Sequence, residues 1–328
     1  MVGVALIGSG RMGLFHGETV SRRLPGVRLV AVADPVPGAA GKLGADREYS
    51  DPAQVWEDSE VDAVVIAAPA RFHADLAVAA ARAGKHVFCE KPMALSVADA
   101  DRVIDAVRAA GVVLQVGFNR RFAPDWVAAR VLIEDGRVGT PRLLRSLTRD
   151  PGGFEPARVA PGTIFLETLI HDFDTLRFLN PGSEATHVHT FADALVEPTW
   201  RDRGLLDTAV VTVRFGNGAV GTAEACFEAS YGYDVRGEVL GAGGMVTMGD
   251  GRRTGMTFSG PAGRLVDTAR GDQELFAGAY VAEMAAFTDA VRTGAPSTVT
   301  GEDARAALAI ALAAAESART GKVAEVAK

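Results

Sequence analysis

The sequence predicts an α/β protein in which a doubly wound parallel sheet is followed by an α+β part with a largely antiparallel sheet. Three observations predict this fold class. Short apolar runs alternate with helical patterns over residues 1–120, which is typical of a parallel sheet covered by helices. After residue 120, strand patterns follow one another with few helices between them. A Gly-Asn-Gly turn at 216–218 joins two of these runs, as in an antiparallel hairpin.

The N-terminal stretch has the order strand, glycine-rich turn, helix, strand. Val2–Ile7 is apolar and contains β-branched residues, as a buried parallel strand requires. The turn Gly8-Ser-Gly-Arg-Met-Gly13 follows directly, then an amphipathic helix, and a second apolar strand at 27–33 ends at Asp34. The first glycine permits the tight turn, the second lets a pyrophosphate approach the backbone, and the third lets helix and strand pack closely.

This order predicts a Rossmann dinucleotide-binding domain. A helix N-terminus offers unpaired N–H groups and a positive dipole end to phosphates. Asp34 lies 21 residues after Gly13, where a carboxylate accepts a hydrogen bond from a ribose 2′-hydroxyl and would repel a 2′-phosphate. Pro35 and Val36 supply no guanidinium, so we expect NAD rather than NADP. The residues predicted to bind the dinucleotide here are Gly8, Gly10, Arg11, Met12, Gly13 and Asp34.

Composition narrows the class of protein. The 328 residues are 48% hydrophobic and 23% charged, which indicates a globular chain of two domains. A net charge of −7 argues against a nucleic-acid-binding surface. No apolar run approaches the ~18 residues of a membrane span, and no basic leader precedes an apolar segment. Cys89 and Cys226 form no CxxC pair or disulfide framework, so we expect a cytoplasmic protein.

The remaining patterns place a domain boundary near residue 120. We expect a dinucleotide-binding domain at 1–120 and a substrate-binding and oligomerisation domain at 121–328, with the helix at 302–320 packing on either half. The loop at 150–162 is rich in glycine and proline and long enough to suspect a function. Further strands are expected at 61–67, 85–89, 112–118, 142–148, 186–194, 207–215, 220–228 and 235–240, and further helices at 71–83, 96–110, 124–135, 162–179 and 274–292.

Lys91 follows the strand at 85–89, at the carboxyl edge of the predicted parallel sheet where such folds bind ligands. In water the amine of a lysine is protonated at neutral pH and therefore cannot act as a base. Burial beside a positively charged nicotinamide favours its neutral form. Pro92 restricts the backbone of Lys91, which favours a functional role. The alternative is a solvated lysine or one paired with Glu90.

His171 lies in the predicted helix at 162–179. Glu167 is four residues before it and Asp174 three residues after it, so all three share one face. An imidazole can accept the proton of an alcohol as hydride leaves the carbon, and a carboxylate one turn away can orient the ring. The apolar positions that would face the core are Phe165, Leu169, Phe173 and Leu176.

These motifs together resemble the glucose–fructose oxidoreductase/inositol dehydrogenase family. The residues that carry the resemblance are the turn Gly8–Gly13, the segment GKHVFCEKP ending at Pro92, VGFNRRF, HDFD, YGYDVRGEVLGAGGMV and TGEDARAAL. They span the chain, and the similarity is greatest to the inositol 2-dehydrogenases. The resemblance implies an active-site role for Lys91, a general base at His171, and a cofactor-positioning peptide at Pro92. It also implies homotetramers.

Other candidate residues rest mainly on this resemblance. Ala68, Pro69 and His73 match the turn that passes the nicotinamide ribose. The same cofactor-binding set includes Glu90, Lys91 and Pro92. Substrate-binding candidates are Asn119, Arg120, Asp150 and Tyr233, with ordinary loop polarity or an aromatic sheet contact as the alternative. Tyr231 and Tyr233 alternate, so both are expected on one side of a strand. His187 and His189 also alternate, but they lack a third ligand at metal-binding spacing, and we expect no metal.

The predicted activity is therefore NAD-dependent oxidation of a ring hydroxyl of a cyclitol, foremost myo-inositol to scyllo-inosose. Lys91, Glu167 and His171 are the predicted catalytic residues. The inositol dehydrogenases carry Asp four residues before the histidine, where this chain has Glu167; the extra methylene shifts the carboxylate by ~1.5 Å. Alternatives are an NAD(P)-dependent dehydrogenase of a related sugar, inosose or aminocyclitol, an NADP reductase working in the other direction, or a non-catalytic NAD-sensing regulator.

Overall fold

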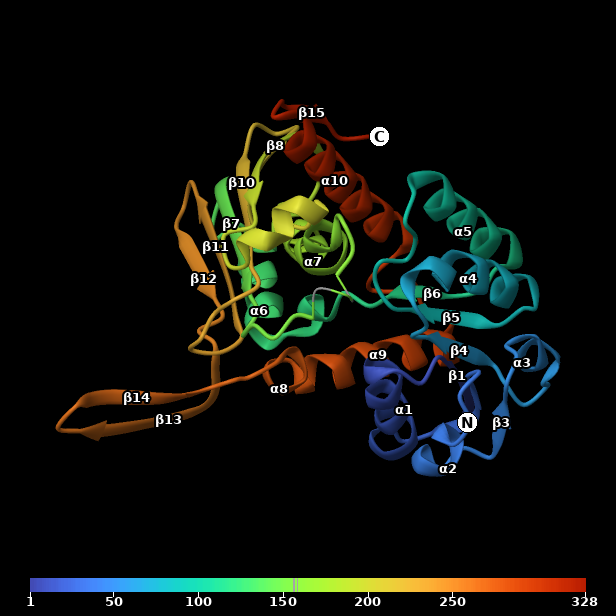
Figure 1. Cartoon of the computed structure of the whole chain (residues 1–328). Helices are drawn as coiled ribbons and strands as arrows, with labels where there is room; N and C mark the ends of the chain where they lie inside the picture. The colour runs from blue at the N-terminus through green and yellow to red at the C-terminus, as the bar shows by residue number, and fades with distance from the viewer. Residues whose placement is uncertain (156, 158) are drawn as a thin grey trace. The chain divides into compact units, whose positions relative to one another are not determined.

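The computed structural model of the chain describes residues 1–155, 157 and 159–328 (Figure 1). The chain forms two compact units. The first contains Met1–Asn119 and Gly278–Leu308, and the second contains Arg120–Ala277 and Ala309–Lys328. The sequence also predicts a boundary near residue 120, but it assigns residues 278–301 to the second half and leaves the helix at 302–320 open to either half. In the part of the chain that the structure describes, no helix has the length and apolar character needed to cross a membrane.

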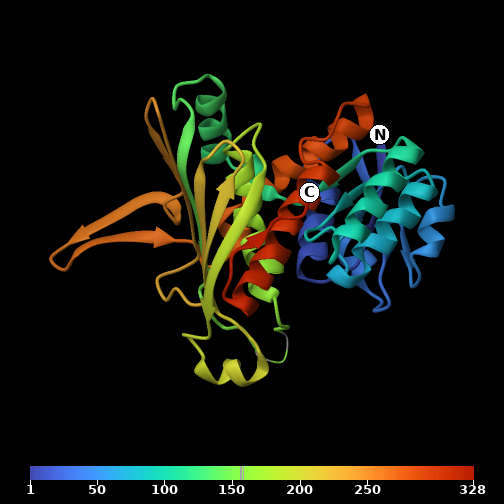
Figure 2. The same ribbon diagram turned by 90° about the horizontal axis from the view of Figure 1, so that it is seen from above.

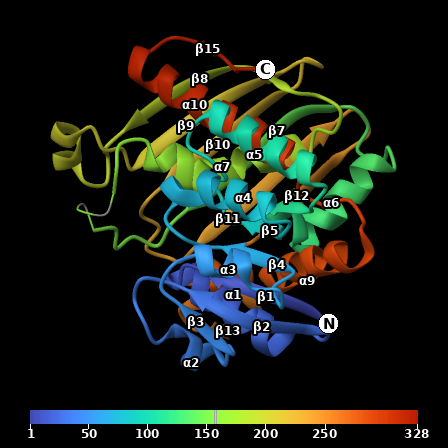
Figure 3. The ribbon, with the colours of Figure 1, turned by 90° about the vertical axis from the view of Figure 1, so that its right-hand side faces the viewer.

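The first unit is built on a six-stranded parallel sheet with the order β3-β2-β1-β4-β5-β6 (Figure 3). The strand order reverses between β1 and β4, and ligands of such sheets bind beside the carboxyl ends of the strands at this point. The predicted parallel sheet is thus confirmed. The strands are β1 (Val2–Ile7), β2 (Val27–Ala33), β3 (Arg47–Tyr49), β4 (Ala63–Ile66), β5 (His86–Cys89) and β6 (Leu114–Val116).

Helices cover both faces of this sheet. On one face, Val4 and Leu6 of β1 and Phe88 of β5 pack in a common core with Val20 of α1 and Phe287 of α9. Helices α4 and α5 lie side by side (Figure 3). Residues 120–277 separate helix α9 in sequence from the first part of this unit, and the apolar face of α9 completes this core. The helices are α1 (Arg11–Arg23), α2 (Ala39–Leu43), α3 (Ala53–Glu57), α4 (His73–Arg82), α5 (Val97–Ala110), α9 (Ala277–Thr293) and the start of α10 (Gly301–Thr320).

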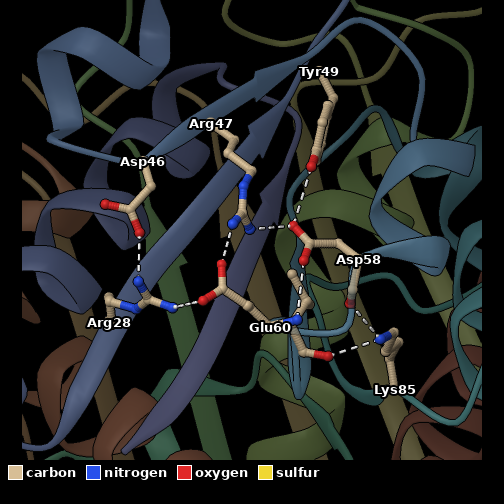
Figure 4. Close-up of polar contacts among 8 residues, drawn as sticks. Arg28, Asp46, Arg47, Tyr49, Asp58, Glu60 and Lys85 are labelled. Atoms are coloured by element: carbon tan, nitrogen blue, oxygen red, sulfur yellow. Dashed lines mark hydrogen bonds and ion pairs between the residues drawn. The ribbon is translucent and has the colours of Figure 1, made fainter.

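Arginines of β2 and β3 bind carboxylates of the segment that leads into β4 (Figure 4). Arg47 Nη1 donates to Asp58 Oδ2 (2.8 Å), and Arg47 also pairs with Glu60. Arg28 Nη2 donates to Glu60 Oε1 (3.2 Å). Lys85 is buried, and its Nζ donates to the backbone carbonyl oxygens of Asp58 and Val61, both at 2.8 Å. The exposed ion pairs contribute little individually, whereas Lys85 satisfies two carbonyl groups beneath the sheet.

The second unit contains a seven-stranded sheet with the order β12-β11-β7-β10-β9-β8-β15 (Figure 2). Its strand pairs are antiparallel except β7 with β10, so the predicted, largely antiparallel sheet is confirmed. The strands β13 and β14 form a separate hairpin that projects from this sheet (Figure 2). The bounds are β7 (Pro141–Arg149), β8 (Ala185–Asp193), β9 (Thr208–Phe215), β10 (Val220–Cys226), β11 (Asp234–Gly241), β12 (Met245–Met248), β13 (Arg252–Gly260), β14 (Gly263–Thr268) and β15 (Ala324–Glu325).

One face of the seven-stranded sheet is covered by helices. Strand β9 alternates buried Ala209, Val211, Val213 and Phe215 with more exposed polar and apolar residues, and helix α7 packs on β7 and β10. The predicted turn Gly216–Gly218 joins β9 to β10, with Gly218 at φ +88°. The other helices of this unit are α6 (Pro124–Glu134), α7 (Ile170–Phe178), α8 (Asp272–Leu275) and the rest of α10. Of the suspected loop at 150–162, residues 156 and 158 lie outside the described part.

Candidate active site

The glycine turn between β1 and α1 has the geometry that a pyrophosphate needs. Gly8 has φ +89°, and a Cβ at this position would lie 2.7 Å from the backbone nitrogen of Ala68. A Cβ on Gly13 would lie 2.0 Å from the carbonyl oxygen of Gly8. At Gly10, by contrast, a Cβ would meet no described atom within 4 Å, so the space above this backbone is open. The turn therefore fits the phosphates of a dinucleotide at the N-terminus of α1, where Arg11 and Met12 begin the helix.

Asp34 ends β2 beside this turn. Its Oδ2 accepts hydrogen bonds from the backbone N–H of Ser9 (2.6 Å) and from the Ser9 hydroxyl (2.8 Å), and its Oδ1 accepts from the N–H of Val36 (2.8 Å). Burial by itself raises the pKa of Asp34, but these hydrogen bonds outweigh it and lower the pKa overall. The group is thus an ionised acceptor fixed at the edge where a ribose would lie.

Replacing Asp34 with alanine is expected to reduce the preference for NAD over NADP. The variant loses an acceptor for the ribose hydroxyl and a charge that repels a 2′-phosphate, so we expect the ratio of the two kcat/KM values to fall by about 10- to 100-fold. Steady-state kinetics with both dinucleotides measures the ratio. Asp46→Ala, which removes an exposed carboxylate of the same unit, is the control. Unchanged discrimination in Asp34→Ala would contradict the ribose role.

A second turn follows β5 and contains Glu90, Lys91 and Pro92. His16 Nε2 donates to Glu90 Oε1 (2.6 Å), and the backbone N–H of Lys91 donates to Glu90 Oε2 (3.1 Å). The Lys91–Pro92 peptide is cis. Burial raises the pKa of Glu90, but the hydrogen bond from His16 and the positive charge of Lys91 lower it overall. The carboxylate of Glu90 therefore fixes the backbone of Lys91 through its N–H group.

His73 joins this turn to the one after β4. Its Nδ1 lies 2.8 Å from the carbonyl oxygen of Pro92 and its Nε2 lies 2.7 Å from that of Ala68. The predicted residues Ala68, Pro69, His73, Glu90, Lys91 and Pro92 thus lie around one edge of the sheet, with Gly8 in reach of Ala68. Cys89, beneath them, is buried, and burial raises the pKa of its thiol, so it is not a nucleophile.

The helix that carries His171 begins with a π-helical turn at Ile164–Leu169, which continues as α7. The sequence predicts a regular helix here, because the spacing of its apolar residues does not reveal a π turn. Such turns occur frequently at functional sites. Glu167 lies exposed in the π turn, and His171 is half-buried at the start of α7. The predicted apolar stripe is buried, as expected: Phe165, Leu169, Phe173 and Leu176.

Two buried carboxylates of α7 form ion pairs with buried arginines. Arg121 donates from Nε and Nη2 to the two oxygens of Asp174, at 2.9 and 2.6 Å. Both oxygens of the Asp174 carboxylate thus bind a buried guanidinium, and a role of Asp174 beside His171 stays a prediction. Asp172 Oδ1 accepts from Arg120 (2.8 Å), and Asp172 also accepts from the hydroxyls of Ser146 and Thr148. These networks fix α7, and with it His171, on the sheet of the second unit.

The substrate-binding candidates have different surroundings. Asn119 is buried and ends the first unit, whereas Arg120 begins the second. The guanidinium of Arg120 is buried against Asp172 and the Thr148 hydroxyl (2.6 Å), so its main contacts are within the protein. Asp150 follows β7, and its backbone pairs with Cys226. A role in substrate binding stays a prediction for each of these residues.

Tyr231 and Tyr233 do not share one side of a strand. Both precede β11, Gly232 between them has φ +136°, and this breaks the extended alternation. Tyr231 is exposed and donates to Asp234 Oδ2 (2.6 Å), whereas Tyr233 is buried. Burial, followed by the charge of Asp150, raises the pKa of Tyr233, so it remains a neutral hydroxyl.

His187 and His189 lie half-buried on β8. In the described residues, His, Cys, Asp and Glu side chains form no group of three or more that is arranged to hold a metal. Sequence reasoning missed His16, which lies 74 residues from its partner Glu90. An apolar helix pattern carries no signal for a contact at that separation.

The parallel sheet, the glycine turn and Asp34 define a dinucleotide-binding enzyme of Rossmann type. A family model described as an oxidoreductase family with an NAD-binding Rossmann fold matches residues 2–118, and one for the C-terminal alpha/beta domain of that family matches residues 130–326. The chain belongs to this GFO/IDH/MocA oxidoreductase family and is an NAD-dependent oxidoreductase. The family resemblance, the fold class and the cofactor predicted from the sequence are confirmed.

Relatives match over nearly the whole chain. It is 36% identical to a scyllo-inositol 2-dehydrogenase (NAD(+)) of Bacillus subtilis, covering 97% of this chain and 94% of that protein. It is also 36% identical to a myo-inositol 2-dehydrogenase of Thermotoga maritima, covering 96% and 95%. A crystal structure of a scyllo-inositol dehydrogenase from Lactobacillus casei, with bound NAD(H) and scyllo-inositol, matches with a TM-score of 0.96 at 26% identity, covering 100% of both chains.

Proposed function

We propose that this chain oxidises a ring hydroxyl of a cyclitol, foremost myo-inositol to scyllo-inosose, with NAD as the hydride acceptor. One observation carries the proposal: the chain matches inositol dehydrogenases over nearly its full length and retains both Lys91 and His171. A regulator that only senses NAD would need neither an amine after β5 nor an imidazole at the start of α7. Retention of both therefore favours an enzyme.

The proposed roles follow from the chemistry of each side chain. His171 accepts the hydroxyl proton, because an imidazole takes up a proton near neutral pH. Lys91 stabilises the negative charge that develops on the oxygen, and its backbone is held by Glu90. Glu167 orients the cyclitol ring of the substrate or the imidazole of His171. When bound, NAD supplies the hydride acceptor at nicotinamide C4. The product is a ketone, an inosose where the substrate is an inositol.

A related substrate is the second candidate, and Glu167 favours it. The resemblance assigns aspartate to this position in inositol dehydrogenases, and a carboxylate ~1.5 Å longer changes which ring hydroxyl it can reach. Curated relatives at the same identity also differ in their named substrate, scyllo-inositol in one case and myo-inositol in the other. A related sugar, inosose or aminocyclitol is therefore the alternative substrate.

A panel of inositol isomers, aminocyclitols and pyranoses with NAD tests the assignment. We expect NADH formation with at least one inositol, and Glu167→Asp to raise kcat/KM for myo-inositol relative to the other isomers by about 10-fold. Glu134→Asp, the same change at an exposed position of α6 in the second unit, is the control. Activity confined to pyranoses would remove the inositol assignment. Absence of NADH formation with every polyol would favour the regulator.

We also propose a homo-oligomer, a homotetramer by the family resemblance, that forms through the uncovered face of the seven-stranded sheet. Exposed apolar residues that are paired across neighbouring strands have their side chains on this face. Phe191, for example, is 73% exposed. Apolar patches of this kind mark interaction sites, and here a second copy of the chain is the expected occupant. The exposed apolar residues are Leu143, Phe191, Val210, Leu240 and Met245. The two free cysteines support a reducing, cytoplasmic location.

Charge placed on this face is expected to reduce the mass of the particle in solution. Phe191→Glu combined with Val210→Glu would bury two carboxylates in the proposed interface, so we expect light scattering to report a smaller species. Val323→Glu alters an exposed apolar residue of the same unit outside these strands and should leave the mass as in the parent chain. An unchanged mass in the double variant would exclude this face as the interface.

A further inference from the structure

Helix α9 of the first unit carries a carboxyl group that the proposed reaction does not use. Glu283 is 0% exposed, and neither of its carboxyl oxygens has a hydrogen-bond partner among the described residues. A buried carboxylate without donors is strongly disfavoured, whereas a neutral carboxylic acid is tolerated and can still donate one hydrogen bond. The side chain is therefore expected to carry a proton.

Ring contacts place His16 beside the face of α9 that carries Glu283. Tyr280 and Phe287 lie three residues before and four residues after Glu283, on the same helix face. The ring of His16 lies 5.9 Å from that of Tyr280 and 5.4 Å from that of Phe88, between ring centroids, and Phe88 lies 5.8 Å from Phe287. Glu283, His16 and the end of β5 thus line one small buried region.

A second buried atom in this region also lacks a partner. His16 Nε2 donates to Glu90, but no described atom bonds its Nδ1, which in this tautomer is an acceptor. An acceptor without a donor and a carboxylic acid without an acceptor are complementary. A buried water molecule that bonds both groups would satisfy them, as such waters ordinarily do.

The charges in this region indicate which of the two carboxyl groups, Glu283 or Glu90, carries a proton. The titratable groups around Glu283 are His16 of α1, Tyr280 of its own helix, and Glu90 and Lys91 after β5, with His73 beyond Glu90. Burial raises the pKa of Glu283 well above its usual value, and the negative charge of Glu90 raises it further. Glu90 has two donors and keeps the negative charge, so the two carboxyl groups differ in protonation.

We propose that Glu283 is a positioning residue for Lys91: its protonated carboxyl group, through one buried water, fixes the His16 tautomer that donates to Glu90, which in turn holds the backbone N–H of Lys91. The chain of contacts is Glu283, water, His16 Nδ1, His16 Nε2–H, Glu90 and Lys91 N–H. It rests on the proposed function only in the role of Lys91. The arrangement of Glu283, His16 and Glu90 is independent of the substrate.

Two variants of matched size test the proposal. Glu283→Gln keeps a donor for His16 Nδ1, whereas Glu283→Leu keeps the volume and removes it. We expect Glu283→Leu to lower kcat by about 10- to 100-fold with little change in KM for NAD, and Glu283→Gln to lower it much less. Met284→Leu, a buried and nearly isosteric change on the same helix, controls for packing damage.

Two further readouts distinguish positioning from packing and need no turnover. Nitrogen NMR of the chain labelled at its histidines, with His16→Gln for assignment, is expected to show His16 protonated at Nε2 alone in the parent chain and in Glu283→Gln. We expect this tautomer to be lost in Glu283→Leu. Infrared spectroscopy is expected to show a protonated carboxyl band at neutral pH that Glu283→Gln removes.

Any of three results would overturn the proposal: a proton on His16 Nδ1 in the parent chain, an unchanged tautomer in Glu283→Leu, or no carboxyl band assignable to Glu283. The first and third are measured without the leucine variant, so its failure to fold would not leave the proposal undecided. If these readouts come out as expected but no polyol is oxidised, the proposed function fails and the His16 arrangement stands.

Discussion

Replacing Lys91 with alanine is expected to lower turnover by about 10²- to 10⁴-fold while the chain still binds NAD. The amine is proposed to stabilise charge that develops only in the transition state, so its loss should appear in kcat rather than in the KM for NAD. The dinucleotide contacts predicted at the glycine turn and at Asp34 do not involve the Lys91 side chain. NAD affinity, measured by calorimetry, should therefore change little.

The control is Lys42→Ala, which removes an exposed lysine from α2 of the same unit. Its turnover and NAD affinity should equal those of the parent chain. Retained turnover in Lys91→Ala would remove Lys91 from the mechanism. Parallel loss of turnover and NAD affinity would instead make it a cofactor-binding residue.

His171→Ala is expected to lower turnover by a comparable factor. A bell-shaped pH profile of kcat/KM in the parent chain that loses its acidic limb in this variant would assign the base to His171.

The first unit was predictable where its signals are local. Val2–Ile7 and the turn to Gly13 lie within a few residues of one another, and each glycine has a steric task that the structure displays. The same holds for the end of β2 at Asp34 and for the turn after β5. In a parallel sheet these short segments all end at one edge, so the position of the cofactor-binding residues follows from their order.

Contacts between distant segments were not predictable. Nothing local in 278–308 indicates that it completes the first unit, because the apolar face of α9 would pack equally well on either half. The edge strand β12, the hairpin β13–β14 and the two-residue strand β15 were also missed. Strand β13 is exposed almost throughout, so it lacks the alternation that reveals a half-buried strand.

The candidate site divides in the same way. Lys91 and His171 could be chosen as candidates from the sequence because their neighbours form motifs, whereas His16 and Glu283 could not. His16 and Glu283 resemble ordinary polar positions on amphipathic helices, and only the structure shows that both are buried and that His16 binds Glu90. Asp174 is a similar case, since helical spacing placed it beside His171 but gave no sign of the buried Arg121 that binds both of its oxygens.

The buried acid of α9 is expected to make the chain less stable as pH rises. In the folded chain the pKa of Glu283 is raised well above 4.5, by burial first and by Glu90 second, so the folded state keeps a proton that the unfolded state releases. Wherever the folded state binds more protons, the free energy of unfolding falls with pH, by ~1.4 kcal/mol per pH unit for one proton. This penalty begins near pH 4.5 and grows until Glu283 itself ionises.

Glu283→Gln removes this titration, so its free energy of unfolding relative to the parent chain should increase as the pH is raised from about 5 to 7, by at most ~1.4 kcal/mol per pH unit. Denaturant unfolding of the NAD-free chains at several pH values measures the difference. Glu57→Gln, at an exposed position of α3, controls for the loss of an ordinary carboxylate. A constant difference between Glu283→Gln and the parent across this range would mean that Glu283 is ionised in the folded chain. In that case a donor must reach it, and the buried pair with Glu90 would carry two negative charges instead of one.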